Sequence, residues 1–160
     1  METITEVRHQ VVRVQLPFDH FTRNIEAALP PLDRALMDKV GTEPGMVEAE
    51  LAKRHGHGFL FMQVDHGLLL TMVGAPRKAM LYALGNPLTL SKMTRLDMRA
   101  GLYGPLHLLV YEDDSQQVFA EYDLPSSVFG QFGNPEVKKV AEFIDERVAE
   151  LIAEADQESH

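Results

Sequence analysis

The four tyrosines of this sequence are the first candidates for a functional site. All of them fall within one stretch, so the fold can bring their hydroxyl groups together. Tyr82, Tyr103, Tyr111 and Tyr122 lie within residues 78–132, and the rest of the chain has none. A phenol joins an apolar ring to a polar tip, so several phenols on one face can rim an apolar pocket and orient a ligand. Ordinary strand packing is the alternative, since tyrosine is also frequent in strands.

Two polar residues near prolines, Asn86 and Asp123, are the next candidates. Asn86 directly precedes Pro87, and Asp123 stands two positions before Pro125. An amide and a carboxylate held on rigid turns can bind a polar group of a ligand, and a desolvated carboxylate can act as a base. Both residue types also cap helices and close turns, which is a purely structural use.

Histidines provide the grouping that resembles metal ligands. His55 and His57 are two residues apart, and Asp65 and His66 follow them. Residues two apart share a face of an extended segment, which is one way to hold a divalent ion. Glycines flank His57, however, and His66 with Gly67 matches a two-residue turn, which favours loop positions for these side chains. We therefore predict no metal and no other cofactor, and we retain His66 as a candidate ligand-binding, acid or base residue.

The motifs of familiar enzyme classes are missing from the sequence. It has no G-x-S-x-G elbow, no phosphate-binding glycine loop and no dinucleotide fingerprint. Because it lacks cysteine, it cannot form disulfides, use a thiolate or build an iron–sulfur cluster. Its eight methionines can soften an apolar pocket or simply fill a core.

Charge and hydropathy restrict the possible partners. Fifteen Lys and Arg against twenty-four Asp and Glu give a net charge of −9, which disfavours nucleic acid and anionic lipid. No run approaches about 18 uncharged apolar residues, and the first residues lack the pattern of a signal peptide. We therefore expect no membrane span, a cytoplasmic location and a single domain over residues 1–160.

Apolar patterns inside the tyrosine-bearing stretch predict an antiparallel sheet. Residues 106–111 form a nearly continuous apolar run, and residues 118–122 alternate, which places Val118, Ala120 and Tyr122 on one face. The acidic and small polar residues between the two runs favour a hairpin turn. Outside this stretch we expect a strand at 10–16 and a hairpin over 59–73 whose turn is His66 and Gly67.

Helical periodicity covers the N-terminal part of the chain between these strands. Apolar residues recur at steps of three and four from Phe21 to Val40, and Pro30 and Pro31 interrupt them. This pattern predicts two helices or one sharply kinked helix, with the second part starting at the prolines. A shorter helix is expected at 46–54.

The C-terminal helix has the strongest local signals. Asn134 is a suitable N-cap, Pro135 fits the first helical position, and an apolar stripe follows as far as Ile152. From Glu154 onward we expect a frayed tail. Another helix is expected at 87–96, because Pro87 likewise suits a first turn.

The combination of these motifs, in this order, resembles the domain of unknown function 302 family. The matching residues are Tyr82, Gly85, Asn86, Pro87, Leu88, Met93, Leu102, Tyr103, Pro105, Leu106, Tyr122, Asp123, Pro125 and Ser126. The resemblance implies a TATA-box-binding-protein-like fold, with a curved antiparallel sheet covered by helices, and no established activity. It also favours a strand at 77–84. Residues 18–58 make this chain a longer variant than the shorter members of that family.

These observations lead to one fold prediction and three functional hypotheses. We expect the α+β class, with a curved antiparallel sheet of about five to six strands and a long C-terminal helix. The leading hypothesis is a module that binds a small, partly apolar molecule between sheet and helices, through Tyr82, Asn86, Tyr103, Tyr122, Asp123 and His66. The second is an enzyme of unknown reaction in which Asp123 or His66 transfers a proton and Tyr82 or Tyr103 stabilises charge. The third is a structural homodimer that pairs exposed sheet edges.

Overall fold

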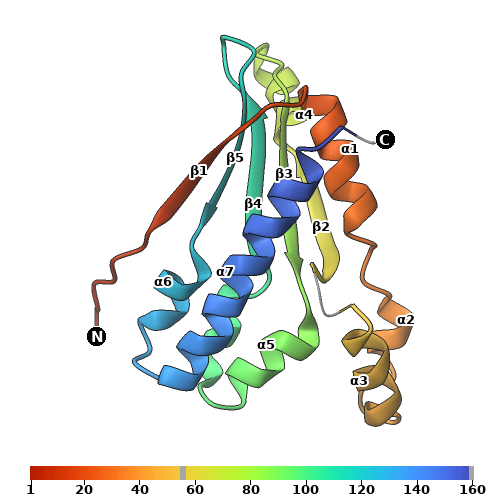
Figure 1. Ribbon diagram of the computed structural model, residues 1–160, viewed down its shortest axis with the longest axis vertical. Helices are drawn as coiled ribbons and strands as arrows, with labels where there is room; N and C mark the ends of the chain where they lie inside the picture. Colours follow the sequence, from red (N-terminus) through yellow and green to blue (C-terminus); the bar gives the residue numbers. More distant parts are fainter. Residues whose placement is uncertain (55–56, 159–160) are drawn as a thin grey trace.

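A five-stranded antiparallel sheet organises the molecule. The computed structural model describes residues 1–54 and 57–158. The strand order is β1-β5-β4-β3-β2, so β1 and β2 form the edges (Figure 1). The strands are β1 (His9–Val14), β2 (Phe59–Asp65), β3 (Ala79–Gly85), β4 (Leu106–Glu112) and β5 (Val118–Asp123). With the long helix at the C-terminal end, this arrangement confirms the predicted α+β class and the curved sheet.

Helices lie in three of the connections between strands and after the last strand. They are α1 (Phe18–Ala28), α2 (Arg34–Met37), α3 (Pro44–Ala52), α4 (His66–Leu69), α5 (Pro87–Thr94), α6 (Pro125–Gly130) and α7 (Pro135–Ala155), with 3-10 helices η1 (Leu70–Val73) and η2 (Met98–Tyr103). Two of them, α1 and α7, pack against the sheet. Within the described ranges, none of the helices has the length and apolar character that crossing a membrane requires.

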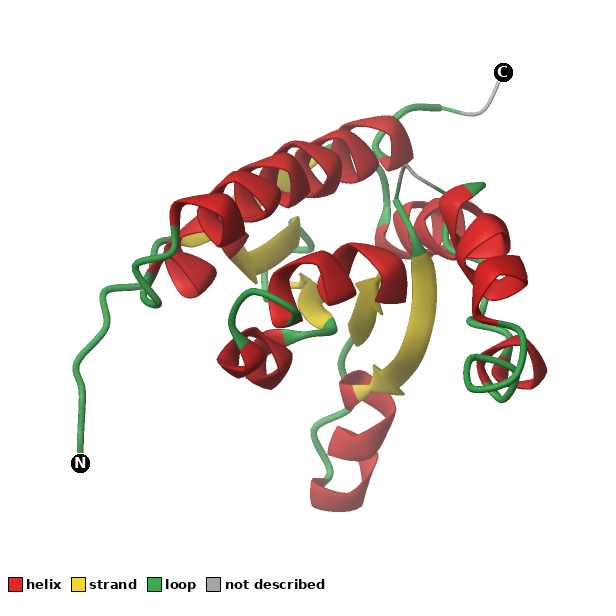
Figure 2. Ribbon diagram, turned by 90° about the horizontal axis from the view of Figure 1, so that it is seen from below, coloured by secondary structure: helices red, strands yellow, loops and turns green. Residues whose placement is uncertain are grey.

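The main core lies between α1, α7 and the face of the sheet that we call the inner face. Figure 2 shows the long helix α7 lying across this side of the sheet. Ile25 of α1, Tyr82 of β3, Leu108 of β4 and Leu151 of α7 are all buried in this core. The face on the other side of the sheet is called the outer face. Side chains alternate between the two faces along each strand.

The β4–β5 hairpin and its side-chain alternation match the sequence prediction. Val118, Ala120 and Tyr122 are buried on the inner face, and Phe119 and Glu121 alternate with them. In the turn, the Asp113 carboxylate accepts hydrogen bonds from the amides of residues 115 and 117. The acidic turn is therefore built by the local side-chain to backbone bonding that the sequence predicted.

Helix α7 also forms as predicted. The Asn134 side chain accepts hydrogen bonds from the amides of Glu136 and Val137, and Pro135 occupies the first turn. We expected fraying from Glu154, yet the helix includes Ala155, and the Asp156 carboxylate accepts hydrogen bonds from backbone amides of residues 15 and 16 after β1. These bonds attach the end of α7 to the segment between β1 and α1.

The predicted hairpin over 59–73 is wrong. Its first arm is strand β2, but β2 pairs with β3, in a register that places Asp65 opposite Met80. The following residues form α4 and η1, because the Asp65 carboxylate accepts a hydrogen bond of 2.7 Å from the amide of Leu68 and caps the helix. His66 and Gly67 therefore open a helix and do not form a hairpin turn. The apolar run that suggested a strand leaves Met72 exposed.

The second predicted helix of the N-terminal region starts later than expected. Helix α1 ends at Ala28, and the two prolines then run beside β2, where the Leu60 amide donates to the Pro30 carbonyl and Leu32 donates back to Leu60. Helix α2 begins only after Asp33, whose carboxylate caps it, and it ends at Met37. The prolines thus add an extended segment to the sheet edge, where a missing amide is tolerated.

The remaining elements differ from prediction at their ends. Strand β1 covers 9–14 where 10–16 was expected, and α3 covers 44–52 where 46–54 was expected. Strand β3 takes the place of the strand predicted at 77–84. Helix α5 starts at Pro87 as predicted and ends at Thr94, two residues before the predicted end.

Candidate functional site

A small apolar cavity lies between the inner face of the sheet, α5 and α7. Its volume is about 60 Å³. The apolar part of the wall comes from the end of β3, from α5, from the start of β4 and from α7, and includes Leu84, Leu90, Met93, Leu106, Ile144 and Leu151. Such a position between a sheet and its covering helices is a common place for a ligand site.

Two glycines allow the backbone to close around this cavity. Gly58 has a φ of 81°, and a Cβ there would lie 2.4 Å from the carbonyl oxygen of Gly85. A Cβ on Gly104 would lie 2.6 Å from the Leu90 side chain. Glycine therefore lets the segment before β2 reach the end of β3, and lets the segment before β4 reach α5.

Two of the predicted site residues, Asn86 and Tyr103, line this cavity. The Asn86 side chain accepts from the amide of Leu88 at 2.9 Å and donates to the carbonyls of Leu51 and Arg54 at 3.0 and 3.2 Å. Its amide is thereby committed to capping α5 and holding α3 against it. The ring of Tyr103 packs edge-on against Phe129, with 6.3 Å between the ring centroids.

Two further polar side chains line the same cavity, His57 and Arg147. The Nδ1 atom of His57 and the Nε atom of Arg147 are buried and have no hydrogen-bond partner among the described residues. The other nitrogen of His57, Nε2, lies 2.8 Å from the Glu154 carboxylate. A terminal nitrogen of Arg147 donates to Glu150 at 2.5 Å. Each side chain is thus anchored by a glutamate of α7 and keeps one buried nitrogen without a partner among the described residues.

The sequence-based reasoning missed Arg147. It correctly placed His57 in a loop, since His57 lies in a turn before β2, but it missed the role of this residue in the cavity wall. A signal for Arg147 did exist, because it stands three residues after Ile144 and four before Leu151, both on the apolar stripe of the last helix. A charged residue at such a position lies against the core side of the helix. No comparable local signal connects His57 to α7, since the contact joins residues 57 and 154.

Tyr82 and Tyr122 belong to the main core and not to the cavity wall. Tyr82 is fully buried, and its hydroxyl donates to Glu26 of α1 at 2.9 Å. Burial raises the pKa of the Tyr82 phenol well above its ordinary value, and burial also raises that of Tyr122. Both rings act in packing between sheet and helices.

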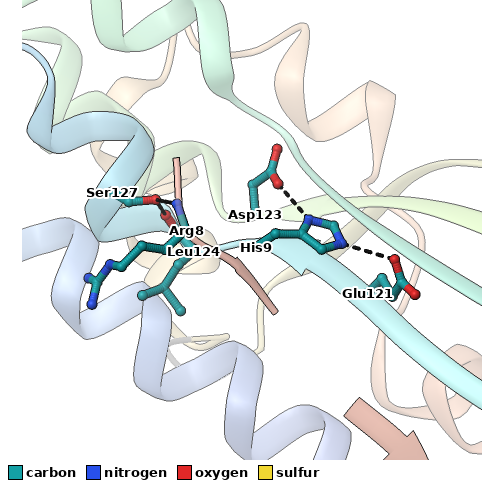
Figure 3. A network of polar contacts seen from close by, with 6 residues as sticks. All are labelled: Arg8, His9, Glu121, Asp123, Leu124 and Ser127. Carbon is teal, nitrogen blue, oxygen red and sulfur yellow. Dashed lines mark hydrogen bonds and ion pairs between the residues drawn. The ribbon is translucent and has the colours of Figure 1, made fainter. Parts of the chain in front are cut away.

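Asp123 lies on the outer face, where it joins a polar cluster of His9, Tyr111, Glu121 and Asp123. Figure 3 shows the His9 ring between the two carboxylates, with Nδ1 2.8 Å from Asp123 and Nε2 2.9 Å from Glu121. The Tyr111 hydroxyl donates to the other oxygen of Glu121 at 2.6 Å. We call this group the outer cluster.

Hydrogen bonding in the outer cluster shifts three pKa values. The bonds to Asp123 and then Glu121 raise the pKa of His9. The bonds from Tyr111 and then His9 lower the pKa of Glu121, and the same Glu121 bond raises the pKa of Tyr111 to about 12. The bonds favour the charged forms of Glu121 and His9, and they favour the neutral phenol of Tyr111, which donates to the Glu121 carboxylate.

Backbone bonds fix the strand ends that carry the outer cluster. The Leu124 amide donates to the Arg8 carbonyl at 2.8 Å, and the Arg8 amide donates to the Ser127 hydroxyl at 2.9 Å (Figure 3). His9 and Asp123 are direct partners in the β1–β5 ladder. With Tyr111 on β4, the cluster is thus a cross-strand arrangement that joins β1, β5 and β4.

His66 is exposed at the start of α4 and lines a wide depression on the outer face together with Tyr111 and Glu121. The structure therefore separates the residues named for the enzyme hypothesis. Asp123 contacts His9, Tyr103 lines the cavity, and Tyr82 lies in the main core. A proton-transfer site would need an acid or base and a charge-stabilising phenol together.

The histidine grouping that resembles metal ligands is also dispersed. His55 lies outside the described residues, His57 bonds Glu154, and the Asp65 carboxylate caps α4. Within residues 1–54 and 57–158, no three histidine, aspartate or glutamate side chains gather in a way that would hold a metal ion.

Comparisons with known proteins bear on the family and the fold. The model of a family described as "Domain of unknown function DUF302" matches residues 45–155. Among solved structures, the chain is similar to the crystal structure of the uncharacterized conserved protein DUF302 from Bacillus stearothermophilus, with a TM-score of 0.66 and 17% identity over 92% of this chain and 97% of that chain. No curated protein matches the chain. At this identity the structural similarity shows a common fold.

Proposed function

The chain belongs to the DUF302 family, and from that premise we propose that it is a binding module whose small, partly apolar ligand occupies the cavity between β3, α5 and α7. One observation carries this proposal. The cavity is lined mainly by apolar side chains, and two of the residues singled out from the sequence, Asn86 and Tyr103, belong to its wall. Apolar walls with a few placed polar groups are typical of small-molecule sites.

The cavity has room for a few non-hydrogen atoms of a ligand. Its volume of about 60 Å³ is less than half of the roughly 150 Å³ that accommodates benzene in an engineered protein cavity. Asn86 shapes the wall, because its amide is already bonded within the protein, and Tyr103 supplies an aromatic side. In this proposal Tyr82, Tyr122, Asp123 and His66 do not touch the ligand.

Methyl resonances offer a direct test. Met93 is 1% exposed and lines the cavity, so its methyl group reports occupancy. A small-molecule extract of the host cells should shift the Met93 signal in the wild type. Leu106→Phe, which adds a ring at the cavity wall, should abolish the shift.

The matched control is Leu109→Phe, the same substitution on the outer face of the same strand. It should leave the Met93 shift intact. The proposal is wrong if Met93 does not respond to any extract, or if the response persists in Leu106→Phe as strongly as in the control.

We also retain the homodimer as a second proposal, because one sheet edge favours it. Strand β1 pairs with β5 and has no other strand neighbour among the described residues, and Val11 on it is 56% exposed. Unpaired strand edges can be covered by a second copy. Native mass spectrometry should then show twice the chain mass, and Val11→Pro should reduce the assembly to monomers. A monomer mass for the wild type contradicts this proposal.

A further inference from the structure

The unpaired nitrogens in the cavity indicate the chemical class of its ligand. We infer that the cavity binds a short-chain monocarboxylate, whose carboxyl group contacts Arg147 Nε and His57 Nδ1 and whose carbon chain lies against Leu90, Met93 and Ile144. This inference rests on the proposed function, because it assumes that the cavity is a binding site. It adds the type of molecule that the site would take.

Buried polar atoms of native proteins almost always have a hydrogen-bond partner. His57 and Arg147 line the same cavity, and their buried atoms Nδ1 and Nε lack a partner among the residues that the structure describes. Leaving such atoms unpaired costs free energy, and the cost is larger for a charged group. Two of them beside one apolar cavity point to a polar group that both would contact.

The other contacts of Arg147 leave its Nε available to bond a ligand. The guanidinium lies over the Phe143 ring, 5.3 Å from the centroid, and Glu150 takes one terminal nitrogen. These contacts fix the plane of the group and leave Nε as a buried nitrogen without a partner among the described residues. Arginine always carries its charge and can only donate, so the ligand must present an acceptor to Nε.

His57 is oriented in a comparable way. Glu154 accepts from Nε2, which assigns a proton to that nitrogen and leaves the buried Nδ1 without a partner among the described residues. In the neutral ring Nδ1 then accepts a hydrogen bond, and in the protonated ring it donates one. The ligand group must therefore suit either state of Nδ1.

A carboxyl group meets both requirements. As a carboxylate it accepts from Arg147 Nε and from protonated His57, and as a carboxylic acid it accepts from Arg147 and donates to neutral His57. A phosphate brings more oxygens than these two nitrogens can bond, and the apolar wall cannot bond the others. The volume of about 60 Å³ leaves space for only a short carbon chain.

Propionate and its neutral isostere propionamide provide the test, again with the Met93 methyl signal as the readout. Propionate should bind the wild type more tightly than propionamide by roughly 10-fold or more. Arg147→Lys keeps a positive charge and an aliphatic stem over Phe143 but removes Nε. It should weaken propionate binding by roughly 10- to 100-fold.

Arg13→Lys is the matched control for Arg147→Lys. The Nε of Arg13 donates to Gln117 at 2.7 Å, on β1 and away from the cavity, so its removal should leave propionate affinity unchanged. A second pair of variants tests His57 independently of Arg147. The amide of His57→Asn can replace Nδ1, whereas the longer side chain of His57→Gln replaces Nε2, so His57→Asn should retain more propionate affinity than His57→Gln.

The outcomes separate this inference from the proposed function. If propionamide binds as tightly as propionate, or if Arg147→Lys binds propionate like Arg13→Lys, the carboxylate assignment is overturned and the cavity is still a binding site. If neither probe, nor xenon as a purely apolar probe, shifts the Met93 signal of the wild type, both proposals fail.

Discussion

The cavity and the outer cluster lie on opposite faces of one sheet, and they differ in whether their polar groups have hydrogen-bond partners. In the outer cluster, both ring nitrogens of His9 have a carboxylate partner, and the Tyr111 hydroxyl has one too. Beside the cavity, His57 and Arg147 each keep a buried nitrogen without a partner among the described residues. The outer cluster therefore has more acidic and basic groups than the cavity wall, but these groups already have hydrogen-bond partners within the protein.

This difference shows why residue types alone are a poor guide to a site. The outer cluster is exposed to water, where ion pairs contribute little and no ligand is needed to complete the bonding. Beside the cavity, two buried nitrogens lack partners among the described residues. Because unpaired polar groups are costly in an apolar surrounding, a ligand that bonds to these nitrogens is favoured over one that does not. Two pairs of substitutions and one single substitution test this contrast between the two faces.

The largest expected effect comes from adjacent leucines of β4. Leu108 is 1% exposed on the inner face, whereas Leu109 is half-buried on the outer face. Leu108→Ala should lower the free energy of unfolding by about 2–5 kcal/mol, because it leaves a void in the main core. Leu109→Ala should cost about 1 kcal/mol. Urea denaturation of both variants measures the difference, and equal losses would mean that the outer face is covered as fully as the inner one.

An intermediate effect is expected from Asn86 and Asp123, the two polar residues near prolines that the sequence analysis considered together. Asn86→Ala removes the cap of α5 and the bonds to α3, and should cost about 1–2 kcal/mol. Asp123→Ala removes an exposed contact to His9, and should cost less than about 1 kcal/mol. Denaturant midpoints compare the two directly. A larger loss for Asp123→Ala would show that the outer cluster is more than a surface network.

The smallest effect concerns pH. Because its bonds to Asp123 and Glu121 raise the pKa of His9, its contribution to stability is fully present below the ordinary value of 6.5 and is lost as pH rises through the raised pKa. Since the pKa of Glu121 is lowered, its contribution is present above the ordinary value of 4.5 and is lost as pH falls through the lowered pKa. His9→Gln should therefore destabilise most between pH 4.5 and 6.5.

The loss in His9→Gln should stay below about 1 kcal/mol, because the pairs are half-exposed and screened. Denaturation of wild type and variant in this pH range, and again well above pH 6.5, measures it. A difference that grows as pH rises has the wrong sign and would contradict the assignment of the His9 charge.

The sequence by itself determined the elements whose signals are local. The cap at Asn134, the proline after it and the apolar stripe specify α7, and the proline at 87 specifies the start of α5. Period-two alternation with an acidic turn specifies the β4–β5 hairpin. In each case the residues that decide the structure are neighbours along the chain, so their physical preferences can be read without knowing the fold.

Tertiary structure decided the rest, because the deciding contacts join distant residues. The run after Asp65 is apolar enough for a strand, but β2 pairs with β3, and those residues become α4 and η1. The four tyrosines are close in sequence, yet strand alternation and the turn before β4 send them to the core, the cavity and the outer face. Only the packing of α7 across the sheet brings Arg147 to the cavity that His57 also lines. Such long-range pairings depend on register and helix packing, which no local pattern encodes.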